Sequence, residues 1–171
     1  MSIETEIKQR AAFTSPFHKV MVNLIYTNNW ITSRNSEDLK PFGLTIQQFN
    51  VLRILRGQHP NAITVNAIID RMLDKMSNAS RLVDKLLAKG LVSRLVCPND
   101  RRAVDVRITD KGLALLSEID KGMSGWESEI TGRLTVEEAE LLSHLLDKMR
   151  GNSTSTDCDG NEVVPEHESV N

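Results

Sequence analysis

The chain has 171 residues, of which 40% are hydrophobic and 26% charged, with a formal net charge of -2 at pH 7. This balance is ordinary for one globular domain with a buried core, and no apolar run reaches the ~18 residues that a membrane span needs. Its polar start is unlike a signal peptide and two cysteines (Cys97 and Cys158) suit a reducing cytoplasm, so we expect no secreted, membrane-spanning or collagen-like protein.

The first predicted helix begins after a polar N-terminus. Residues 1–14 show no periodic pattern, and we expect them to be flexible. Ser15 followed by Pro16 predicts a helix start, because Ser accepts hydrogen bonds from helix N–H groups and Pro lacks the N–H that would stay unpaired. Apolar residues at mostly helical spacing extend the helix to about Leu39, and the segment 40–43, Lys-Pro-Phe-Gly, ends it.

A second helix is predicted from Thr45 to about Gly57. Thr45 and Gln48 have the spacing of a capping box, in which each side chain accepts a hydrogen bond from the other residue's backbone. Its expected apolar face contains Phe49 and Leu52, with Val51 and Leu55 as further candidates.

Two shorter helices follow, separated by about four residues. The third lies between Thr64, its expected N-cap, and about Leu73, and we expect it to bury Ile68, Ile69 and Met72. Ser77 is expected to cap a fourth helix, residues 78–89, in which an apolar stripe lies opposite hydrogen-bonding residue types. Such a pair is typical of a helix-turn-helix.

The pattern then changes from helical to extended. Residues 91–97 are rich in β-branched and aliphatic side chains, and in residues 103–108 apolar residues alternate with Asp105 and Arg107. Turn-forming residues at 98–102 join the two segments. A β-hairpin directly after a helix-turn-helix predicts a winged helix, so the expected fold is mainly α with a small β-hairpin wing.

The remainder is predicted to be helical up to residue 150. Thr109 should cap a fifth helix whose apolar seam suits packing on another helix or on its own core: Leu116, Ile119, Met123, Trp126 and Ile130. Thr135 and Glu138 form a capping box for a sixth helix, residues 136–150, expected to be buried through Leu141, Leu142, Leu145, Leu146 and Met149. Residues 151–171 hold five acidic residues and no Lys or Arg, and we expect a disordered acidic tail.

Positive charge gathers around the predicted helix-turn-helix. Residues 71–111 contain ten basic and five acidic residues, an excess expected of a nucleic-acid site. The start of the fourth helix supplies candidate DNA contacts, since Arg suits guanine, Asn suits adenine and Ser suits either bases or phosphates: Ser77, Asn78, Ser80, Arg81 and Lys85. Asn78 could instead bind phosphate at the helix start, and the alternative for the whole set is an ordinary solvated surface.

The tip of the hairpin is a second candidate contact. Arg101 and Arg102 could enter the narrow minor groove of DNA, where the negative potential is strong. Asp100 beside them could hold one arginine in a fixed orientation. A surface turn without function is the alternative, but here the turn follows a helix-turn-helix.

These motifs resemble those of the MarR family of bacterial transcriptional regulators. Residues 97–112, with Asp100 and Arg102 followed by a strand and Ile-Thr-Asp-Lys-Gly, are similar to the family's wing signature. Residues 43–52 are similar to the entry into its second helix, and residues 77–92 to its recognition helix and exit. The resemblance covers roughly residues 15–150 and leaves out the acidic tail.

The resemblance implies a homodimer that binds a double-stranded, pseudo-palindromic operator, usually as a repressor, and that an inducer releases. A helical dimerisation region, residues 15–40 and 109–150, would join a winged helix-turn-helix DNA-binding lobe, residues 41–108. It implies that Arg102 enters the minor groove with Asp100 as its partner, while Arg101 fits a phosphate contact.

An effector site is expected where the dimer helices meet the DNA-binding lobe. A small phenolic, anionic or apolar ligand is the expected class, with Trp30, Phe49 and Arg53 as candidates and Arg53 as the partner of an anion. Core packing is the alternative for Trp30 and Phe49. No cofactor or metal is expected, because the four histidines are scattered, and Cys97 suits a buried strand position better than a redox role.

Two other classes of function compete with a DNA-binding regulator. A winged helix that contacts protein and has lost DNA binding is the main alternative, motivated by an acidic tail that would repel phosphate or pair with the basic residues. An enzyme is not expected, because the chain lacks a Gly-rich phosphate loop, a metal cluster and a nucleophile motif. The sequence therefore predicts a cytoplasmic DNA-binding regulator.

Overall fold

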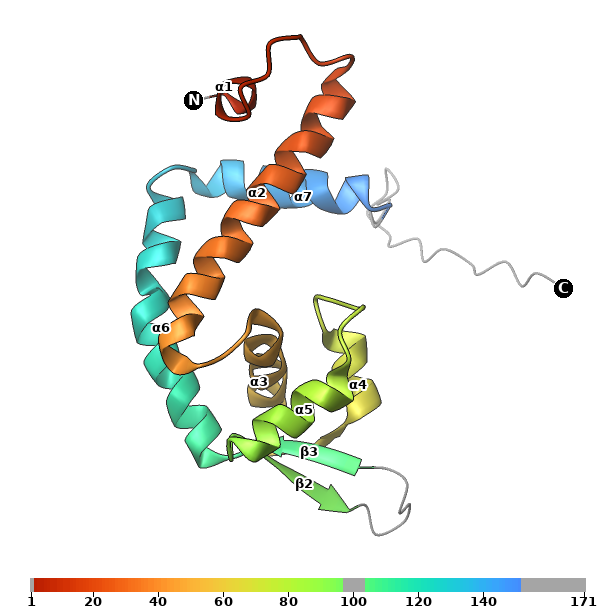
Figure 1. The fold of residues 1–171 in the computed structure, drawn as a ribbon, viewed down its shortest axis with the longest axis vertical. Coiled ribbons are helices and arrows are strands. Elements are labelled where there is room, and N and C mark those ends of the chain that lie inside the picture. The colour runs from red at the N-terminus through yellow and green to blue at the C-terminus, as the bar shows by residue number, and fades with distance from the viewer. Residues whose placement is uncertain (1, 97–103, 152–171) are drawn as a thin grey trace, which may run out of the picture. The chain divides into compact units, whose positions relative to one another are not determined.

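The computed structural model describes residues 2–96 and 104–151, and Figure 1 shows their elements. These elements are α1 (Ile3–Glu6), α2 (Pro16–Leu39), the 3-10 helix η1 (Lys40–Phe42), α3 (Ile46–Gln58), β1 (Ile63–Thr64), α4 (Val65–Arg71), α5 (Ala79–Ala88), β2 (Val92–Val96), β3 (Val104–Ile108), α6 (Asp110–Thr131) and α7 (Val136–Met149). The chain forms two compact units, of which the first ends at Met123 inside α6 and the second begins at Ser124. The predicted class, mainly α with a small antiparallel sheet, is confirmed.

Local capping sets the starts of α2 and α3 as the sequence predicts. The Ser15 hydroxyl accepts a hydrogen bond from the His18 N–H at 3.1 Å, and Pro16 is the first residue of α2. At α3, Thr45 Oγ1 accepts from the Gln48 N–H and Gln48 Oε1 accepts from the Thr45 N–H, both at 3.2 Å. Gly43 has a φ of +64°, a left-handed conformation that glycine adopts without strain, and it lets the chain leave η1 and turn into α3.

The N-terminal stretch contains one element that the sequence pattern does not predict. Ile3–Glu6 form a single helical turn, and the Glu4 carboxylate pairs with the Lys19 ammonium of α2 at 2.7 Å. Ile3 is buried. The contact between Glu4 and Lys19 stabilises this turn, and a single turn is too short to show a periodic pattern in the sequence.

The helix-turn-helix is present as α4 and α5, with one correction to its capping. Asn78, and not Ser77, is the N-cap of α5, because Asn78 Oδ1 accepts from the Arg81 N–H at 3.0 Å. The Ser77 hydroxyl donates instead to Asp74 Oδ2 at 2.7 Å. The helix therefore spans Ala79–Ala88, one residue shorter at each end than predicted.

The predicted hairpin is also present, and a third strand joins it. β2 pairs antiparallel with β3, with Val92 opposite Ile108 and Val96 opposite Val104. β1 pairs with the other edge of β3, so the strand order is β1-β3-β2. β1 was not predicted, because two residues are too few to show the alternation that marks a strand. The tip of the hairpin, residues 97–103, lies outside the described residues.

The core of the first unit lies where α3, α4, α5, the sheet and the start of α6 meet. Fully buried side chains come from each of these elements: Val51, Leu52, Leu55, Ile68, Val83, Leu86, Val106, Leu116 and Ile119. The expected faces of α3 and α4 are confirmed except at Ile69, which is 36% exposed and lies about 100° around the helix axis from the buried Ile68. The side chains of Met123, Trp126 and Ile130 lie outside the described residues, so that part of the predicted seam stays a prediction.

Gly112 brings the first turn of α6 against the hairpin. A Cβ at this position would lie 2.4 Å from the carbonyl oxygen of Leu91 and 2.7 Å from Cγ1 of Ile108. The Thr109 hydroxyl accepts from the Gly112 N–H at 3.2 Å, as predicted for a cap, and donates to the Gly90 carbonyl at 2.8 Å. This close approach fixes how α6 leaves the sheet.

In the second unit, α7 differs from the prediction of a buried apolar face. Its capping box is present, with the Glu138 N–H 3.2 Å from Thr135 Oγ1 and the Thr135 N–H 2.9 Å from Glu138 Oε2. Its apolar side chains are nevertheless about half exposed or partly exposed within the single chain: Leu141, Leu142, Leu145, Leu146 and Met149. The expected burial within the chain was wrong, because helical periodicity marks an apolar face without showing what covers it.

Candidate nucleic-acid interface

The exposed face of α5 carries the polar residues that the sequence singles out. Ala79, Val83 and Leu86 turn one side of the helix into the core, and this leaves the opposite side in solvent. Ser80, Arg81 and Lys85 all lie on that exposed side. A helix of this kind, backed by a rigid core, has the dimensions that the major groove of DNA admits.

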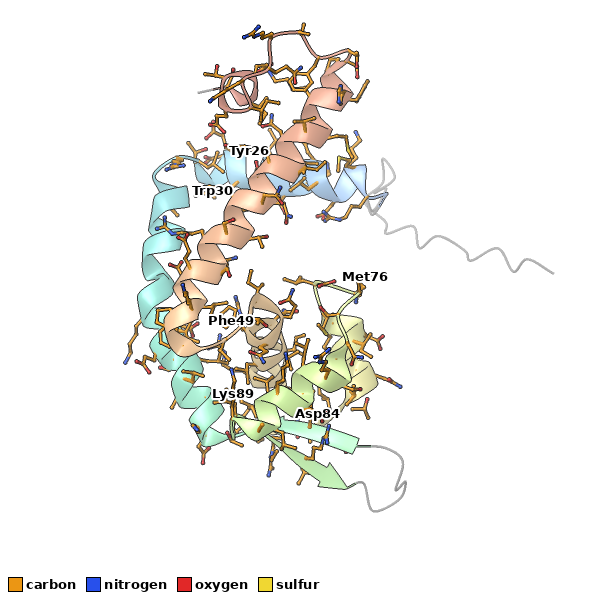
Figure 2. All side chains as sticks on the ribbon, in the orientation of Figure 1. Tyr26, Trp30, Phe49, Met76, Asp84 and Lys89 are labelled. Atoms are coloured by element: carbon orange, nitrogen blue, oxygen red, sulfur yellow. The ribbon has the colours of Figure 1, made fainter. Side chains whose placement is uncertain are left out.

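The turn before α5 begins at Met72, which is buried in the core, and its other residues are held by hydrogen bonds. The Leu73 N–H donates to Asn50 Oδ1 of α3 at 3.1 Å, and the Met76 N–H donates to Asp74 Oδ1 at 3.0 Å. Lys75 Nζ donates to the Asp70 carbonyl at 2.5 Å, at the end of α4. Figure 2 shows Met76 in this turn, with its side chain almost fully exposed.

Asp74 is the residue that organises this turn. Its pKa lies below the ordinary value of 3.8, because it accepts hydrogen bonds from the Ser77 hydroxyl and from the Met76 N–H. Of the candidate contacts, Ser77 and Asn78 therefore both have local partners, one in the turn and the other in the cap. Ser80, Arg81 and Lys85 have side chains directed away from the core.

The charges on and around α5 fall into two groups. The side chains of Arg81 and Lys85 have no hydrogen bond or ion pair with any residue in the described part of the chain. By contrast, Asp84 on the same helix pairs with Arg94 of β2, and the Lys89 ammonium donates to the Gly43 carbonyl. Figure 2 labels Asp84 on α5 and Lys89, the residue that directly follows this helix. Two cations are thus available to an incoming anion, and the neighbouring carboxylate is already paired.

The second predicted contact, the wing tip, is bounded by described strands but is not itself described. Asp100, Arg101, Arg102 and Cys97 lie outside the described residues, so their roles stay predictions. The strands β2 and β3 pair in register up to Val96 and Val104, and these two residues flank the tip. Both strands belong to the same compact unit as α5 (Figure 1).

The three effector candidates do not converge on one site. Phe49 is 9% exposed and belongs to the core, while the Arg53 guanidinium lies 5.8 Å from the centroid of its ring. Trp30 lies on α2 and is 38% exposed. Figure 2 shows Trp30 and Phe49 well apart, so at most the pair of Arg53 and Phe49 forms a local unit.

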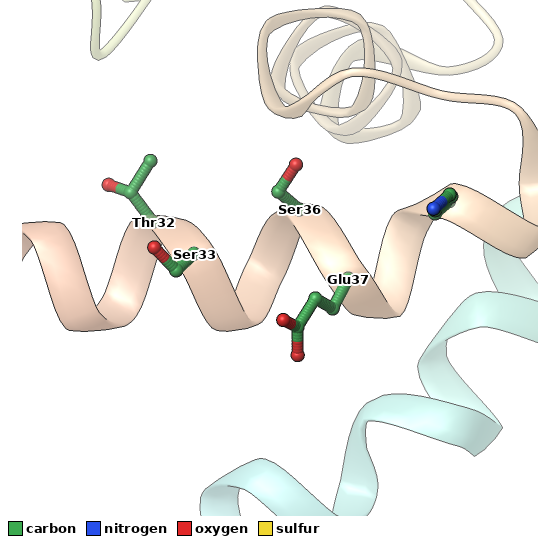
Figure 3. A pocket seen from close by; sticks show the side chains of 5 residues that line it. Thr32, Ser33, Ser36 and Glu37 are labelled. Carbon is green, nitrogen blue, oxygen red and sulfur yellow. The ribbon is translucent and has the colours of Figure 1, made fainter.

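A polar hollow lies along the C-terminal half of α2 and was not predicted. It is lined by Thr32, Ser33, Ser36, Glu37 and Lys40 (Figure 3). Their spacing, with steps of three and four residues, places them on one side of a helix and could have indicated a polar strip. Four of these residues belong to α2, and Lys40 is the first residue of η1, which follows α2 directly.

The described residues contain no group of three or more His, Cys, Asp or Glu side chains arranged to hold a metal ion. No helix among them is both long enough and apolar enough to cross a membrane.

Comparisons with known proteins point to one family. Residues 42–103 match the sequence profile of the MarR family. A MarR transcription factor from Planctomyces limnophilus is 31% identical, with a TM-score of 0.61 over 80% of this chain and 99% of the other. A cysteine-to-serine variant of MarR from Escherichia coli, in complex with operator DNA, is 30% identical, with a TM-score of 0.67 over 80% and 99%.

A more distant match shows the fold alone. BpsR from Bordetella bronchiseptica is 24% identical, with a TM-score of 0.65 over 77% of this chain and 98% of the other. Its structure is described as revealing the mechanism by which 6-hydroxynicotinic acid regulates its DNA binding.

Proposed function

Because this chain belongs to the MarR family of transcription regulators, we propose that it binds a DNA operator sequence-specifically and acts as a ligand-responsive repressor. The observation that carries the proposal is the exposed face of α5, where Arg81 and Lys85 have no partner in the described part of the chain. A relative at 30% identity is known in complex with operator DNA. In this proposal α5 lies in the major groove.

Each candidate residue has a role that its surroundings allow. Arg81, in the first turn of α5, would donate two hydrogen bonds to a guanine edge, and Lys85, one turn further, would contact a base or phosphate. Ser80 would hydrogen-bond a base edge or a phosphate. Ser77 and Asn78 would approach the phosphate backbone beside the N–H groups at the helix start.

The wing would supply the minor-groove contact. Arg102 would enter the groove with Asp100 as its ion-pair partner, and Arg101 would contact a phosphate. These three assignments rest on the family resemblance, because the tip lies outside the described residues.

We propose that the binding species is a homodimer on a pseudo-palindromic site. Support comes from α2 and α7, each of which exposes large apolar side chains within the single chain, such as Phe17 at 82% and Leu145 at 50%. Isolated globular chains rarely leave so many exposed, and contiguous apolar surface marks an interaction site. A dimer would place two recognition helices about one DNA turn, ~34 Å, apart.

An effector would release the DNA. A small phenolic or anionic molecule is the class we propose, with the Arg53 guanidinium beside Phe49 as the group that would attract the anion. For the Bordetella relative, DNA binding is described as regulated by 6-hydroxynicotinic acid. A 6-hydroxynicotinic acid titration of the DNA complex is the first test of this class.

The decisive experiment is fluorescence anisotropy of the purified chain across a salt series. One duplex comes from the region upstream of its own coding sequence and the other is a scrambled duplex of equal length. We expect preferential binding that weakens steeply with salt, because each neutralised phosphate releases counterions. If the upstream duplex and a selection of genomic fragments both show no preference, the chain is a protein-contact module and the proposal is wrong.

Arg81→Ala tests the proposed base contact. Loss of a bidentate contact to guanine costs about 1–3 kcal/mol of discrimination, so we expect an affinity for the preferred duplex that is about 5- to 150-fold weaker. The matched control is Arg10→Ala, which removes the same charge from the N-terminal segment. Equal affinities for wild type and Arg81→Ala would contradict the assignment of Arg81.

A further inference from the structure

The ion pair between Asp84 of α5 and Arg94 of β2 lies beside the proposed DNA contacts. Arg94 lies opposite Val106 in the antiparallel register, and directly paired residues lie on the same face of a sheet. Val106 is fully buried, so Arg94 starts from the core-facing side of β2. Its guanidinium Nη2 reaches out to Asp84 Oδ1 of α5, and its side chain stays 38% exposed.

Asp84 lies on the same exposed side of α5 as the proposed DNA contacts. It follows Arg81 by three residues and precedes Lys85 directly. Side chains three or four residues apart on a helix are neighbours, so a carboxylate at position 84 is within reach of the Arg81 guanidinium. An unpaired Asp84 would therefore compete with DNA for Arg81, and it would also repel phosphate.

We propose that Arg94 is a positioning residue for DNA recognition. By holding the Asp84 carboxylate, Arg94 leaves the Arg81 guanidinium free to bind a base edge and neutralises the negative charge beside it. The inference rests on the proposed function, in which α5 enters the major groove. Arg94 of β2 thus affects sequence specificity through Asp84, without contacting a base itself.

The pair is suited to this role because it contributes little to folding. Asp84 and Arg94 side chains are 58% and 38% exposed, and ion pairs that exposed add little stability. Removing Arg94 should therefore leave the thermal unfolding curve nearly unchanged. An effect on DNA binding can then be separated from an effect on the fold.

The test compares Arg94→Ala, Asp84→Asn and the double variant in the full chain. The probe is the duplex that the wild-type chain enriches most strongly from a random-sequence library, with its scrambled counterpart. The quantity measured is the ratio of the two affinities. We expect Arg94→Ala to lower this ratio about tenfold, the discrimination that one bidentate base contact supplies.

The double variant separates a positioning role from a purely structural one. If Arg94 only supported the fold, a change at Asp84 would not restore the affinity ratio. Asparagine cannot attract Arg81 as a carboxylate does, so Asp84→Asn combined with Arg94→Ala should restore the wild-type ratio. Asp84→Asn alone should tighten binding to both duplexes, because a negative charge has left the face. Arg56→Ala is the control, since it breaks an exposed ion pair with Asp120, at 2.5 Å, away from α5 and β2.

Two outcomes would overturn the inference while leaving the proposed function intact. If Arg94→Ala weakens binding to both duplexes equally, lowers the salt slope by about one and is not rescued by Asp84→Asn, Arg94 is itself a phosphate contact. If the ratio does not change in Arg94→Ala, Asp84 does not compete for Arg81. If the wild-type chain does not discriminate between the duplexes, both proposals are wrong.

Discussion

At the residue scale, short polar side chains around α5 decide which groups remain available to DNA. Asp74 holds the Ser77 hydroxyl, Asn78 caps the helix, and Arg94 holds Asp84. Arg81 and Lys85 are left unpaired among the described residues. Which side chains are paired follows from hydrogen-bond geometry, because each bond forms only where the side chain has the right length to reach its partner.

The Asp74–Ser77 hydrogen bond makes a prediction about pH. Ser77→Ala removes the largest cause that lowers the pKa of Asp74, so that pKa should rise toward 3.8. Since the folded pKa is lowered, the carboxylate's contribution to stability is present above pH 3.8 and is lost as pH falls through the folded pKa. A carboxyl carbon NMR titration of both proteins measures the shift.

The internal control for that titration is Glu137. The pKa of Glu137 is lowered by a hydrogen bond from its own backbone N–H and by the Thr135 hydroxyl, neither of which involves Ser77. It should titrate identically in both proteins. An Asp74 pKa that does not rise in Ser77→Ala would show that the Met76 N–H alone holds the carboxylate.

At the element scale, the hairpin and α6 are joined by a backbone contact that leaves no room for a side chain. Gly112 is the point of contact, since its position lies against the Leu91 carbonyl and the Ile108 side chain. The Thr109 hydroxyl bridges the Gly90 carbonyl and the Gly112 N–H at the same point. The direction in which α6 leaves the hairpin is therefore fixed by packing.

Gly112→Ala should be destabilising for this reason. The new methyl group would meet a backbone oxygen at 2.4 Å, which cannot move aside as a flexible side chain would. Forced overpacking of this kind costs about 1–3 kcal/mol of unfolding free energy, measurable by urea denaturation.

Gly122→Ala in the same helix is the matched control. No atom lies within 4 Å of a Cβ at Gly122, so the only expected effect is a gain in helix propensity of up to about 1 kcal/mol. Opposite signs for the two substitutions are the expected result. If both substitutions destabilise the protein equally, the close contact at Gly112 is not the cause of the destabilisation there.

At the scale of the whole molecule, the proposed homodimer depends on the exposed apolar side chains of α2 and α7. The most exposed apolar side chains on α2 are Phe17, Ile25 and Met21, and on α7 they are Val136 and Leu141. A face this apolar in water favours association, because burying it removes apolar surface from solvent. The proposed two-fold DNA site requires such an assembly.

Leu145→Asp tests the assembly. A carboxylate at the centre of an apolar interface would be buried without a partner, so we expect a dimer in sedimentation velocity for wild type and a monomer for the variant. The control is Leu73→Asp, which places the same charge on another exposed leucine in the turn before α5. A dimer in both variants would show that α7 is not part of the interface.

Loss of the dimer should also affect DNA binding. A monomer occupies one half-site, so the Leu145→Asp variant should lose most of its affinity for a two-fold operator while still folding. If the monomer binds the operator as tightly as wild type, the two-fold model of recognition is wrong.

The sequence by itself determined the local elements of this protein. The first two helix starts, the helix-turn-helix, the paired hairpin strands and the capping boxes at Thr45 and Thr135 could all be predicted. The reason is that capping, helical period and strand alternation depend on residues within a few positions of one another. The polar face of α5 was predictable for the same reason.

Only the tertiary structure decided which groups are paired and which faces are covered. Asn78 rather than Ser77 caps α5 because Asp74 takes the serine hydroxyl, and β1 forms because β3 offers a free edge. The partner of Asp84 lies ten residues away on a strand. The sequence predicts the apolar face of α7 but not its exposure within the single chain. Periodicity describes one helix, whereas burial depends on the neighbours of that helix.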